Sequence, residues 1–394
     1  MTESEPRDSF GLSRNTYLLA AASLFSDIST EMLYPVLPVF LTQTLKASGA
    51  IVGLVDGCAQ ATQNIVQGFS GALSDKTQRR KPLAVTGYLL SAIAKPLMGF
   101  ATIWQVLFAA RLLDRIGAGA RSAPRDALIA ASVDEQSRGR AFGLEGAGDN
   151  AGAFLGPLLA AFLLYALNVE LCSIFYFAMI PGLLALLMVL LVEEQSANVS
   201  AKSIIDTSLR RFPKAYWTYL LATALFAVGN ASNSFLILRT HDVGASLKET
   251  ILIYAGFNLV AASISYPVGS ISDRWGRRNI LLASFLIFLV AYLGFALTQN
   301  VALVACLFVF YGLHQGIFRA VGKAFASDFV PDELRASGMG WYSTTVGLLQ
   351  LVASVVSGLL WDTVGHAAVF FYGAIFAAIG ALALFALAPS RDSE

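Results

Sequence analysis

Long runs of apolar residues, separated by short polar segments, dominate this chain of 394 residues. A helix that crosses a membrane needs about 20 predominantly apolar residues. Runs of that length predict helices at residues 16–42, 49–74, 82–102, 104–128, 139–166 and 169–192, and at residues 216–240, 249–272, 279–298, 300–327, 336–362 and 368–388. The pattern therefore predicts an all-α membrane protein with twelve transmembrane helices.

A short charged segment occurs twice between these runs. Residues 71–80 read GALSDKTQRR, and residues 269–278, which lie 198 positions later, read GSISDRWGRR. This offset is about half the length of the chain, so the two halves are expected to be pseudo-symmetric bundles of six helices around a central cavity. The predicted parts are an N-terminal bundle, a polar cytoplasmic linker and a C-terminal bundle, at residues 1–192, 193–214 and 215–394.

The composition agrees with a membrane protein and argues against other classes. Hydrophobic residues make up 56% of the chain and charged residues 13%, with a mean hydropathy of +0.64, whereas about a quarter of the residues in a soluble domain are charged. The three cysteines are isolated and lack the spacing of metal ligands or disulfide partners, so no metal and no other cofactor is expected. The sequence contains no catalytic motif of an enzyme, and nothing in it supports binding to nucleic acid.

Basic residues collect in alternate loops, and this asymmetry predicts the orientation. Lysine and arginine are frequent at residues 76–81, 138–140 and 274–278 and in the predicted linker, whereas the opposite loops contain few of them. Loops rich in lysine and arginine stay on the cytoplasmic side of a membrane. Both termini and the linker are therefore expected in the cytoplasm.

The repeated charged loop resembles the loop signature of the major facilitator superfamily, G-x-x-x-D-[RK]-x-G-[RK]-[RK]. The second copy fits this signature fully, whereas the first copy has Gln78 where glycine is usual. The residues expected to act in gating are Gly71, Asp75 and Arg79 in the first copy and Gly269, Asp273, Gly276 and Arg277 in the second copy. The resemblance implies a secondary transporter that works by alternating access, and a multi-pass protein of a bacterial inner membrane.

The first predicted helix carries charged residues, which cost at least about 2.5 kcal/mol each at the centre of a bilayer. Asp27, Glu31 and Tyr34 are spaced i, i+4 and i+7, so they share one face of a helix. Asp27 and Glu31 are predicted to bind protons, and Tyr34 is predicted to contact the substrate. The alternative is a structural pair of carboxylates buried against arginines of the fourth helix.

Lys95 lies in the middle of the third predicted helix, where its ammonium group cannot easily reach water. A buried ammonium group needs a carboxylate partner, and Asp56 and Asp114 are among the candidates on neighbouring helices. Lys95 is assigned to substrate binding, with a structural ion pair as an equal alternative.

The fourth predicted helix contains the sequence RLLDRIGAG, which begins at Arg111. It resembles the superfamily's helix 4 signature, in which an arginine is followed by a glutamine, a glycine and further small residues. Here Asp114 replaces the glutamine and Arg115 replaces the first glycine. The resemblance implies that Arg111 biases the proton affinity of a nearby carboxylate, since an adjacent cation favours the charged form. Arg111 and Asp114 are therefore assigned to proton coupling, and Arg115 to substrate binding.

The fifth predicted helix contains small residues with the spacing G-x8-G-x3-G-P, at Gly143, Gly152, Gly156 and Pro157. This spacing resembles the antiporter signature of drug and proton exporters in the same superfamily. The resemblance implies a bendable seal between the halves, whereas the alternative is generic helix packing through small residues. Among the polar residues of this helix, Asp149 is assigned to proton coupling, and Glu145 and Asn150 are assigned to substrate binding.

The second half contains neutral polar and aromatic groups at helical spacing. Such groups suit an amphipathic organic ligand. The predicted substrate-binding residues are Phe226, Asn230, Asn233, Tyr254, Asn258, His314 and Gln315. For His314, a role in packing and a role in proton transfer are both open.

These features favour a secondary active transporter that exports a small organic molecule, drug-like or a metabolite, in exchange for protons. Asp27 or Glu31 would accept a proton from outside and release it inside as Arg111 or the substrate approaches. The alternative is a proton-coupled importer of a small organic anion, favoured by the cations of the third and fourth helices. The expected partners are protons, the substrate and the lipid bilayer, and the protein is expected to be a monomer.

Overall fold

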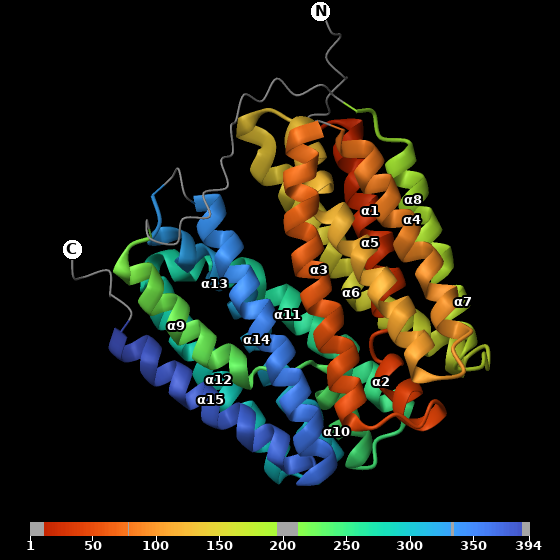
Figure 1. Ribbon diagram of the computed structural model, residues 1–394, viewed down its shortest axis with the longest axis vertical. Helices are drawn as coiled ribbons and strands as arrows, with labels where there is room; N and C mark the ends of the chain where they lie inside the picture. Colours follow the sequence, from red (N-terminus) through yellow and green to blue (C-terminus); the bar gives the residue numbers. More distant parts are fainter. Residues whose placement is uncertain (1–11, 78, 195–211, 332–334, 388–394) are drawn as a thin grey trace, which may run out of the picture. The chain divides into compact units, whose positions relative to one another are not determined.

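The computed structural model describes residues 12–77, 79–194, 212–331 and 335–387 (Figure 1). Gln78 and most of the predicted linker therefore lie outside the described residues. The side chains of Asp75 and Asp273 lie outside the description as well. Within the described ranges every regular element is a helix, which confirms the predicted all-α class.

The helices follow the predicted apolar runs closely. In the first half they are α1 (Arg14–Glu31), α2 (Leu37–Val39), the π-helical turn η1 (Phe40–Thr44), α3 (Gly49–Thr77), α4 (Arg80–Gly99), α5 (Trp104–Ala131), the 3₁₀ turn η2 (Glu135–Ser137), α6 (Arg138–Tyr165), α7 (Ser173–Phe177) and α8 (Met179–Leu190). In the second half they are α9 (Lys214–Gly229), α10 (Ser234–Asp242), α11 (Leu247–Trp275), α12 (Arg277–Leu297), α13 (Val301–Asp328), α14 (Arg335–Thr363) and α15 (His366–Leu387). With the short pieces that continue α1, α7 and α9, the described helices form the twelve predicted membrane segments.

Eight of these segments are long and apolar enough to cross a membrane by length and hydropathy alone, among the helices that the structure describes. The remaining segments contain α1, α3, α4 and α5, which carry ionisable residues in their interiors. Among them are Asp27 on α1, Asp56 on α3, Lys95 on α4 and Asp114 on α5, and Glu31 is the last residue of α1. The least apolar helices are thus the ones that hold most of the predicted coupling residues.

Two helices end earlier than the apolar pattern predicts. The first predicted helix extends to residue 42, but α1 ends at Glu31, because the prolines that follow cannot continue a helix. The seventh predicted helix is continuous from residue 216 to 240, but α9 ends at Gly229 and α10 begins at Ser234. Asn230 has φ −90° and ψ 79°, which lies outside the helical region. Asparagine and serine side chains offer the backbone alternative hydrogen bonds, and this favours a break here.

The chain divides into two compact units. The first unit comprises Met1–Leu45 and Thr62–Ala201, and the second comprises Lys46–Ala61 and Lys202–Glu394. The N-terminal part of α3 therefore groups with the second unit, although it belongs to the first half of the sequence. The predicted linker boundary stays a prediction, since residues 195–211 lie outside the described residues.

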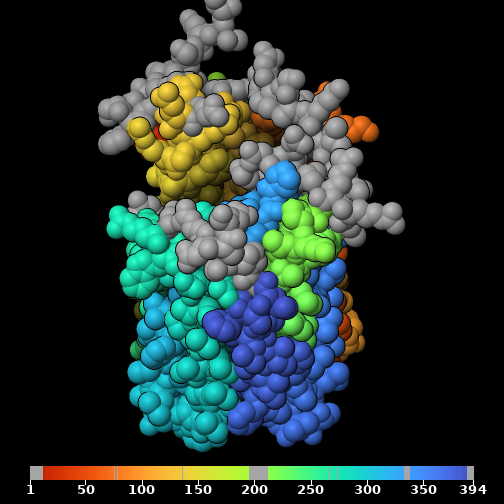
Figure 2. Space-filling model, turned by 90° about the vertical axis from the view of Figure 1, so that its left-hand side faces the viewer, coloured from red at the N-terminus to blue at the C-terminus, as the bar shows by residue number. Residues whose placement is uncertain are grey.

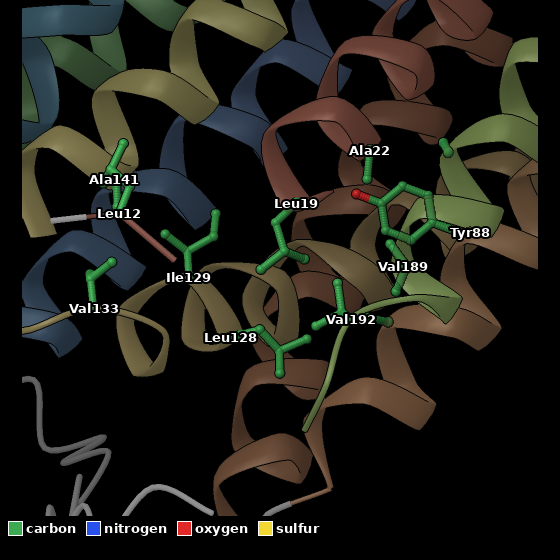
Figure 3. Close-up of a cluster of buried hydrophobic side chains, with 12 residues drawn as sticks. Leu12, Leu19, Ala22, Tyr88, Leu128, Ile129, Val133, Ala141, Val189 and Val192 are labelled. Carbon is green, nitrogen blue, oxygen red and sulfur yellow. The ribbon is translucent and has the colours of Figure 1, made fainter. Parts of the chain in front are cut away.

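In the first unit α1 packs against α6 and α8, and α4 packs along α5 and α8. A buried apolar cluster joins these helices, with Leu19 and Ala22 on α1, Leu128 and Ile129 on α5 and Val189 on α8 (Figure 3). On another side of α1, Ser23 donates a hydrogen bond to Glu145 on α6, and Ser26 accepts one from Arg121 on α5.

In the second unit α12 lies between α13 and α15, α9 packs on α14 and α15, and α11 packs on α13. Figure 2 shows α12 and α15 side by side on the surface of this unit. Large apolar side chains are exposed on both helices, for example Val290 on α12 and Leu382 on α15. A surface of this kind is unfavourable in water and suits the hydrocarbon of a bilayer.

Candidate functional site

The acidic face of α1 contacts the small-residue face of α6. A Cβ atom added to Gly152 would lie 2.6 Å from the carbonyl oxygen of Leu24 and 2.7 Å from the Cβ of Asp27. A Cβ atom added to Gly156 would lie 2.8 Å from another carbonyl oxygen of α1 and 3.0 Å from the Cβ of Glu31. These distances leave no room for a side chain. The two glycines therefore let α1 and α6 touch at the turns that carry the predicted proton-binding residues.

The other positions of the same pattern behave differently. Among the described residues, no atom lies within 4 Å of a Cβ added to Gly143, so these surroundings do not require glycine. Pro157 is buried within α6, one residue after the contact at Gly156. The close contact is thus confined to one part of the pattern, and the predicted bendable seal stays a prediction.

An ion-pair cluster around Arg125 joins α5, α6 and α1. Its Nη1 lies 2.9 Å from Oε1 of Glu145 and 3.8 Å from Oδ1 of Asp149. Its Nη2 also lies 3.0 Å from Oδ1 of Asp126, and Ser23 donates a hydrogen bond of 2.9 Å to Glu145. The carboxylate of Glu145 is therefore engaged by protein groups, and its assignment to substrate binding stays a prediction.

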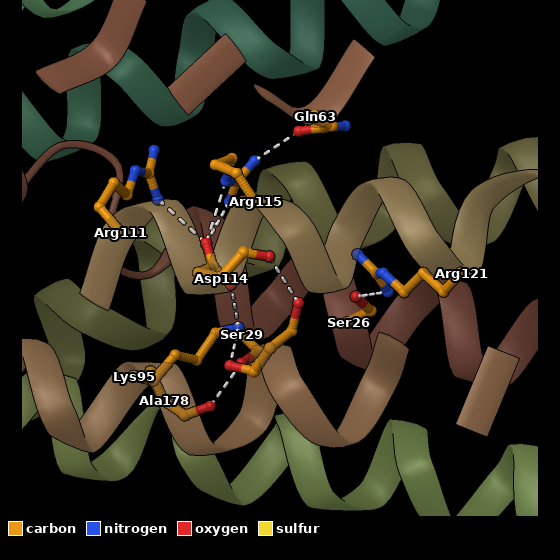
Figure 4. A network of polar contacts seen from close by, with 10 residues as sticks. Ser26, Ser29, Gln63, Lys95, Arg111, Asp114, Arg115, Arg121 and Ala178 are labelled. Carbon is orange, nitrogen blue, oxygen red and sulfur yellow. Dashed lines mark hydrogen bonds and ion pairs between the residues drawn. The ribbon is translucent and has the colours of Figure 1, made fainter. Parts of the chain in front are cut away.

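Asp27 lies half-buried on α1, close to this cluster. It interacts electrostatically with two neighbouring carboxylates and with Arg121 and Arg125 on α5. Within the part of the chain that the structure describes, its carboxylate makes no hydrogen bond or ion pair. Arg121 instead donates a hydrogen bond to Ser26 (Figure 4) and lies 4.5 Å from the centroid of the Tyr88 ring. A carboxylate in such surroundings can gain or lose a proton without breaking an ion pair of its own.

A second charged cluster, which we call the Asp114 cluster, consists of Lys95, Arg111, Asp114 and Arg115 (Figure 4). Asp114 Oδ1 lies 3.3 Å from Nζ of Lys95, and Oδ2 lies 3.4 Å from Nη1 of Arg111 and 2.6 Å from Nη2 of Arg115. The side chain of Asp114 is only 2% exposed. Arg115 also donates a hydrogen bond of 3.0 Å to Gln63 on α3. Three cations therefore share one buried carboxylate.

The Asp114 cluster identifies the partner of Lys95 among the candidate carboxylates. Glu31 and Tyr34 also lie near enough to Arg115 to interact with it electrostatically. Tyr34 lies in the turn after the end of α1 rather than on the helix, so the predicted i+7 position on one helical face does not apply to it. Lys95 is thus part of a structural ion pair, which does not exclude the predicted contact with substrate.

Several predicted substrate-binding residues of the second unit lie in its aromatic core. The hydroxyl of Tyr311 donates a hydrogen bond of 2.6 Å to Oδ1 of Asn233. His314 is fully buried, with Nδ1 2.9 Å from Oγ of Ser284 and its ring centroid 5.4 Å from that of Phe226. In this structure His314 and Phe226 contribute to the packing of the unit, and their roles towards a substrate stay predictions.

The remaining predicted substrate-binding residues lie on α6, α11 and α13 and in the break after α9. Asn230, Tyr254 and Asn258 are buried, whereas Asn150 and Gln315 are half-buried. Oδ1 of Asn230 is buried and has no hydrogen-bond partner among the described residues. An acceptor of this kind is a candidate for a hydrogen-bond donor on the substrate.

The second copy of the charged loop forms a tight turn between α11 and α12. Gly276 has φ +83°, a backbone conformation that glycine adopts at little cost. The next residue, Arg277, has Nη1 3.0 Å from the carbonyl oxygen of Ala324 and 2.6 Å from Oδ1 of Asp328 on α13. The turn and the arginine thus connect the ends of three helices.

The first copy of the loop is described less completely. A Cβ added to Gly71 would lie 3.3 Å from the side chain of Ala123, whereas one added to its counterpart Gly269 has no neighbour within 4 Å in the described part of the chain. Arg79 is exposed and directly precedes α4. Oε1 of Glu194 accepts hydrogen bonds from the first backbone N–H groups of α4. No local sequence pattern indicates this cap, because Glu194 falls in the predicted linker, more than a hundred residues away.

The predicted proton-coupling and substrate-binding residues do not include Arg121 or Arg125, and Asp56 is predicted only as a possible partner of Lys95. The structure places both arginines beside the acidic face of α1, and it places Asp56 in the second unit. Among the described residues no group of histidine, cysteine and acidic side chains could hold a metal ion.

Comparisons with known proteins agree with this architecture. A family model described as Major Facilitator Superfamily matches residues 19–238 and 218–394. An uncharacterised MFS-type transporter of Methanocaldococcus jannaschii is 33% identical over 381 residues, which are 95% of this chain and 94% of that protein. The multidrug resistance protein MdtH of Salmonella arizonae is 23% identical over 360 residues, with 88% of this chain and 86% of that protein covered.

Solved structures resemble the chain over nearly its whole length. The nucleoside transporter NupG has a TM-score of 0.78 at 15% identity, with 95% of this chain and 99% of that chain covered. A D-xylose-proton symporter has a TM-score of 0.78 at 16% identity, with 96% and 98% covered. At these identities the likeness concerns the fold alone.

Proposed function

Since the chain belongs to the Major Facilitator Superfamily, whose members are transporters and not enzymes, we propose that it exports a small organic molecule in exchange for protons. The two six-helix bundles would expose the substrate alternately to the two sides of the membrane. The chain is a multi-pass membrane protein, and its basic loops support a position in a cytoplasmic membrane with both termini inside.

The observation that carries this proposal is the contact between the acids of α1 and the glycines of α6. Gly152 and Gly156 bring the backbone of α6 against the turns that hold Asp27 and Glu31. A change in the protonation of Asp27 alters its attraction to the arginines of α5, and the glycine contacts make α1 and α6 respond as one tightly packed helix pair. Such a pair can respond to one proton, because close-packed interfaces rearrange between discrete states rather than deforming continuously.

Asp27 is the proposed proton carrier. It has no ion pair of its own in the described part of the chain, and Arg121 and Arg125 lie near it on α5. A proton from outside would neutralise Asp27 and weaken its attraction to these arginines. Release of the proton to the cytoplasm would restore the attraction between Asp27 and these arginines, and the first unit would return to its starting arrangement.

Export rather than import is supported by two features. The spacing of small residues in α6 resembles that of proton-driven drug exporters, and a protein that is 23% identical is named a multidrug resistance protein. The neutral and aromatic residues of the second unit suit an amphipathic substrate. A drug-like molecule or metabolite with apolar surface is therefore the proposed cargo.

The proposal is tested by flux in proteoliposomes with an imposed pH gradient. The probes are ethidium as a lipophilic cation, chloramphenicol as a neutral molecule and benzoate as an anion. We expect wild-type protein to move at least one of the first two probes against the proton flow. Asp27→Asn should abolish this coupled flux, since it removes the proton-binding group with little change in shape.

Glu170→Gln is the matched control, because Glu170 is an exposed carboxylate outside the helices. It should transport like wild-type protein. Normal proton-driven flux in Asp27→Asn would refute the assignment of Asp27, and benzoate uptake together with protons would refute the direction.

The second candidate function is import of a small organic anion together with protons. It is favoured by the Asp114 cluster, in which Lys95, Arg111 and Arg115 share one carboxylate. An anionic substrate could compensate cations that Asp114 alone cannot neutralise. Under this function Lys95→Met should abolish benzoate accumulation, whereas the exporter proposal expects no benzoate accumulation in wild-type protein either.

A further inference from the structure

The break between α9 and α10 is the place where the second unit departs from regular helices. Four residues, from Asn230 to Asn233, separate the two helices. The backbone N–H of Ser232 donates a hydrogen bond of 3.0 Å to Oγ of Ser354 on α14, and the N–H of Ser234 donates one of 3.1 Å to Oγ of Ser232. Side chains thus replace the helical hydrogen bonds that the break removes.

The carboxylate of Asp56 on α3 also accepts hydrogen bonds from residues at this break. Its Oδ2 accepts a hydrogen bond of 2.8 Å from Oγ of Ser232 and a second one from Oγ of Ser234. All three side chains are buried. Serines within helices usually donate to the backbone of the preceding turn, as Ser265 does to Ala261. The serines of the break donate instead to a carboxylate on another helix.

Close packing of α3 on α14 brings Asp56 to this position. A Cβ added to Gly53, one turn before Asp56, would collide with the carbonyl oxygen of Ser354, and one added to Gly358 would lie 2.6 Å from Cα of Ala50. The carboxylate of Asp362 accepts hydrogen bonds of 2.8 Å from each of the first two N–H groups of α3. The first part of α3 is therefore fixed to α14, and Asp56 faces the break from a rigid support.

We propose that Asp56 is a positioning residue for substrate recognition by the second unit. It fixes the two serines of the break and thereby the two asparagines beside them, Asn230 and Asn233. Asn230 carries a buried acceptor without a partner among the described residues, and Asn233 accepts a hydrogen bond from Tyr311. This inference rests on the proposed function, in which these asparagines contact the exported molecule.

The physical basis is the strength of hydrogen bonds to a charged acceptor in a low dielectric. Removal of the carboxylate in Asp56→Ala takes away the acceptor of the buried hydroxyls of Ser232 and Ser234. The backbone between α9 and α10 then loses the hydrogen bonds that fix it to α3. Asp56→Asn keeps an oxygen acceptor at the same place. A residue that only stabilised the fold would affect the amount of active protein, whereas a positioning residue changes the apparent affinity for the substrate.

The test combines hydrogen exchange with flux kinetics, both on the full-length protein. In Asp56→Ala we expect amide exchange of the peptide containing residues 229–235 to become faster while peptides of α12 are unchanged. The substrate for the kinetics is ethidium or chloramphenicol, depending on which of the two the wild-type protein exports. We expect its KM to rise by about tenfold or more in Asp56→Ala, while the maximal rate stays within about twofold of the wild-type rate. Asp56→Asn should recover most of the affinity.

Ser234→Ala provides a milder variant if Asp56→Ala does not fold, and it should raise KM in the same direction. Ser265→Ala is its matched control, because it removes a hydroxyl that bonds only within α11. Unchanged exchange at residues 229–235, or faster exchange with an unchanged KM, would overturn the positioning role. Absence of proton-driven flux in wild-type protein would instead refute the proposed exporter, and the inference would fall with it.

Discussion

Replacement of Gly152 by alanine tests whether close contact between α1 and α6 is required. The added Cβ would lie 2.6 Å from the carbonyl oxygen of Leu24, 2.7 Å from the Cβ of Asp27 and 3.0 Å from the backbone nitrogen of Ile28. Two of these three atoms belong to the backbone of α1, so the clash cannot be relieved by rotation of a flexible side chain. The helices must separate locally or the protein must tolerate strain.

The magnitude follows from two opposing effects. Alanine is favoured over glycine in a helix by about 1 kcal/mol, and overpacking a well-packed interior costs about 1–3 kcal/mol. On the same helix, a Cβ added to Gly143 would meet no atom of the described residues within 4 Å, so Gly143→Ala gains the helical preference without the clash. The difference in unfolding free energy between the two variants therefore isolates the clash, at about 1–3 kcal/mol.

The assay is thermal unfolding of the purified variants in one detergent, followed by flux in proteoliposomes. We expect the apparent Tm of Gly152→Ala to lie a few degrees below that of Gly143→Ala, since about 2–4 °C per kcal/mol is typical of domains of about 150–250 residues. Proton-driven flux should fall in Gly152→Ala and stay near the wild-type rate in Gly143→Ala. Equal Tm values and equal flux in the two variants would refute the close contact between α1 and α6.

Two further pairs of variants test other parts of the structure. Asp114→Ala should destabilise the protein by about 3–5 kcal/mol, because it removes the carboxylate that the buried Lys95 and Arg111 share with the half-buried Arg115. Lys95→Met should cost much less, and denaturation curves that rank the two variants the other way would contradict the Asp114 cluster. Gly276→Ala should lower the free energy of unfolding by about 1–2 kcal/mol, because the φ of +83° at this residue is unfavourable for residues with a Cβ. Gly269→Ala should not destabilise the protein, because an added Cβ meets no described atom within 4 Å. Equal melting temperatures of the two variants would contradict the tight turn at Gly276.

The membrane segments and the repeated loops could be predicted because their signal is local. An apolar run of sufficient length specifies a spanning helix whatever its neighbours are. The charged loop was recognisable because it occurs twice, and in the second copy its glycine lies at the residue where the backbone requires positive φ, Gly276. The spacing of Gly152 and Gly156 likewise indicated a tightly packed helix, although the sequence did not say which helix they contact.

The partners of buried charges could not be predicted in the same way. Lys95 had candidate carboxylates on several neighbouring helices, and only the packing of α4 on α5 selects Asp114. Asp56 was grouped with the first half because of its position in the sequence, yet its hydrogen bonds connect it to the second unit. The break after Gly229 was missed because the apolar run continues through it.

The geometry around α1 suggests where the force for the proposed cycle arises. Asp27 and Glu31 are one turn apart, which corresponds to about 6 Å along a helix. Asp27 lies near Arg121 and Arg125 on α5, whereas Glu31 lies near Arg115. The glycine contacts bind α1 to α6 through the backbone, and protonation does not alter those contacts. Attraction between α1 and α5 does depend on the charge of Asp27. In the proposed cycle, α1 and α6 would therefore move together relative to α5. Loss of coupling in Asp27→Asn without loss of stability at the α1–α6 contact would agree with this order of events.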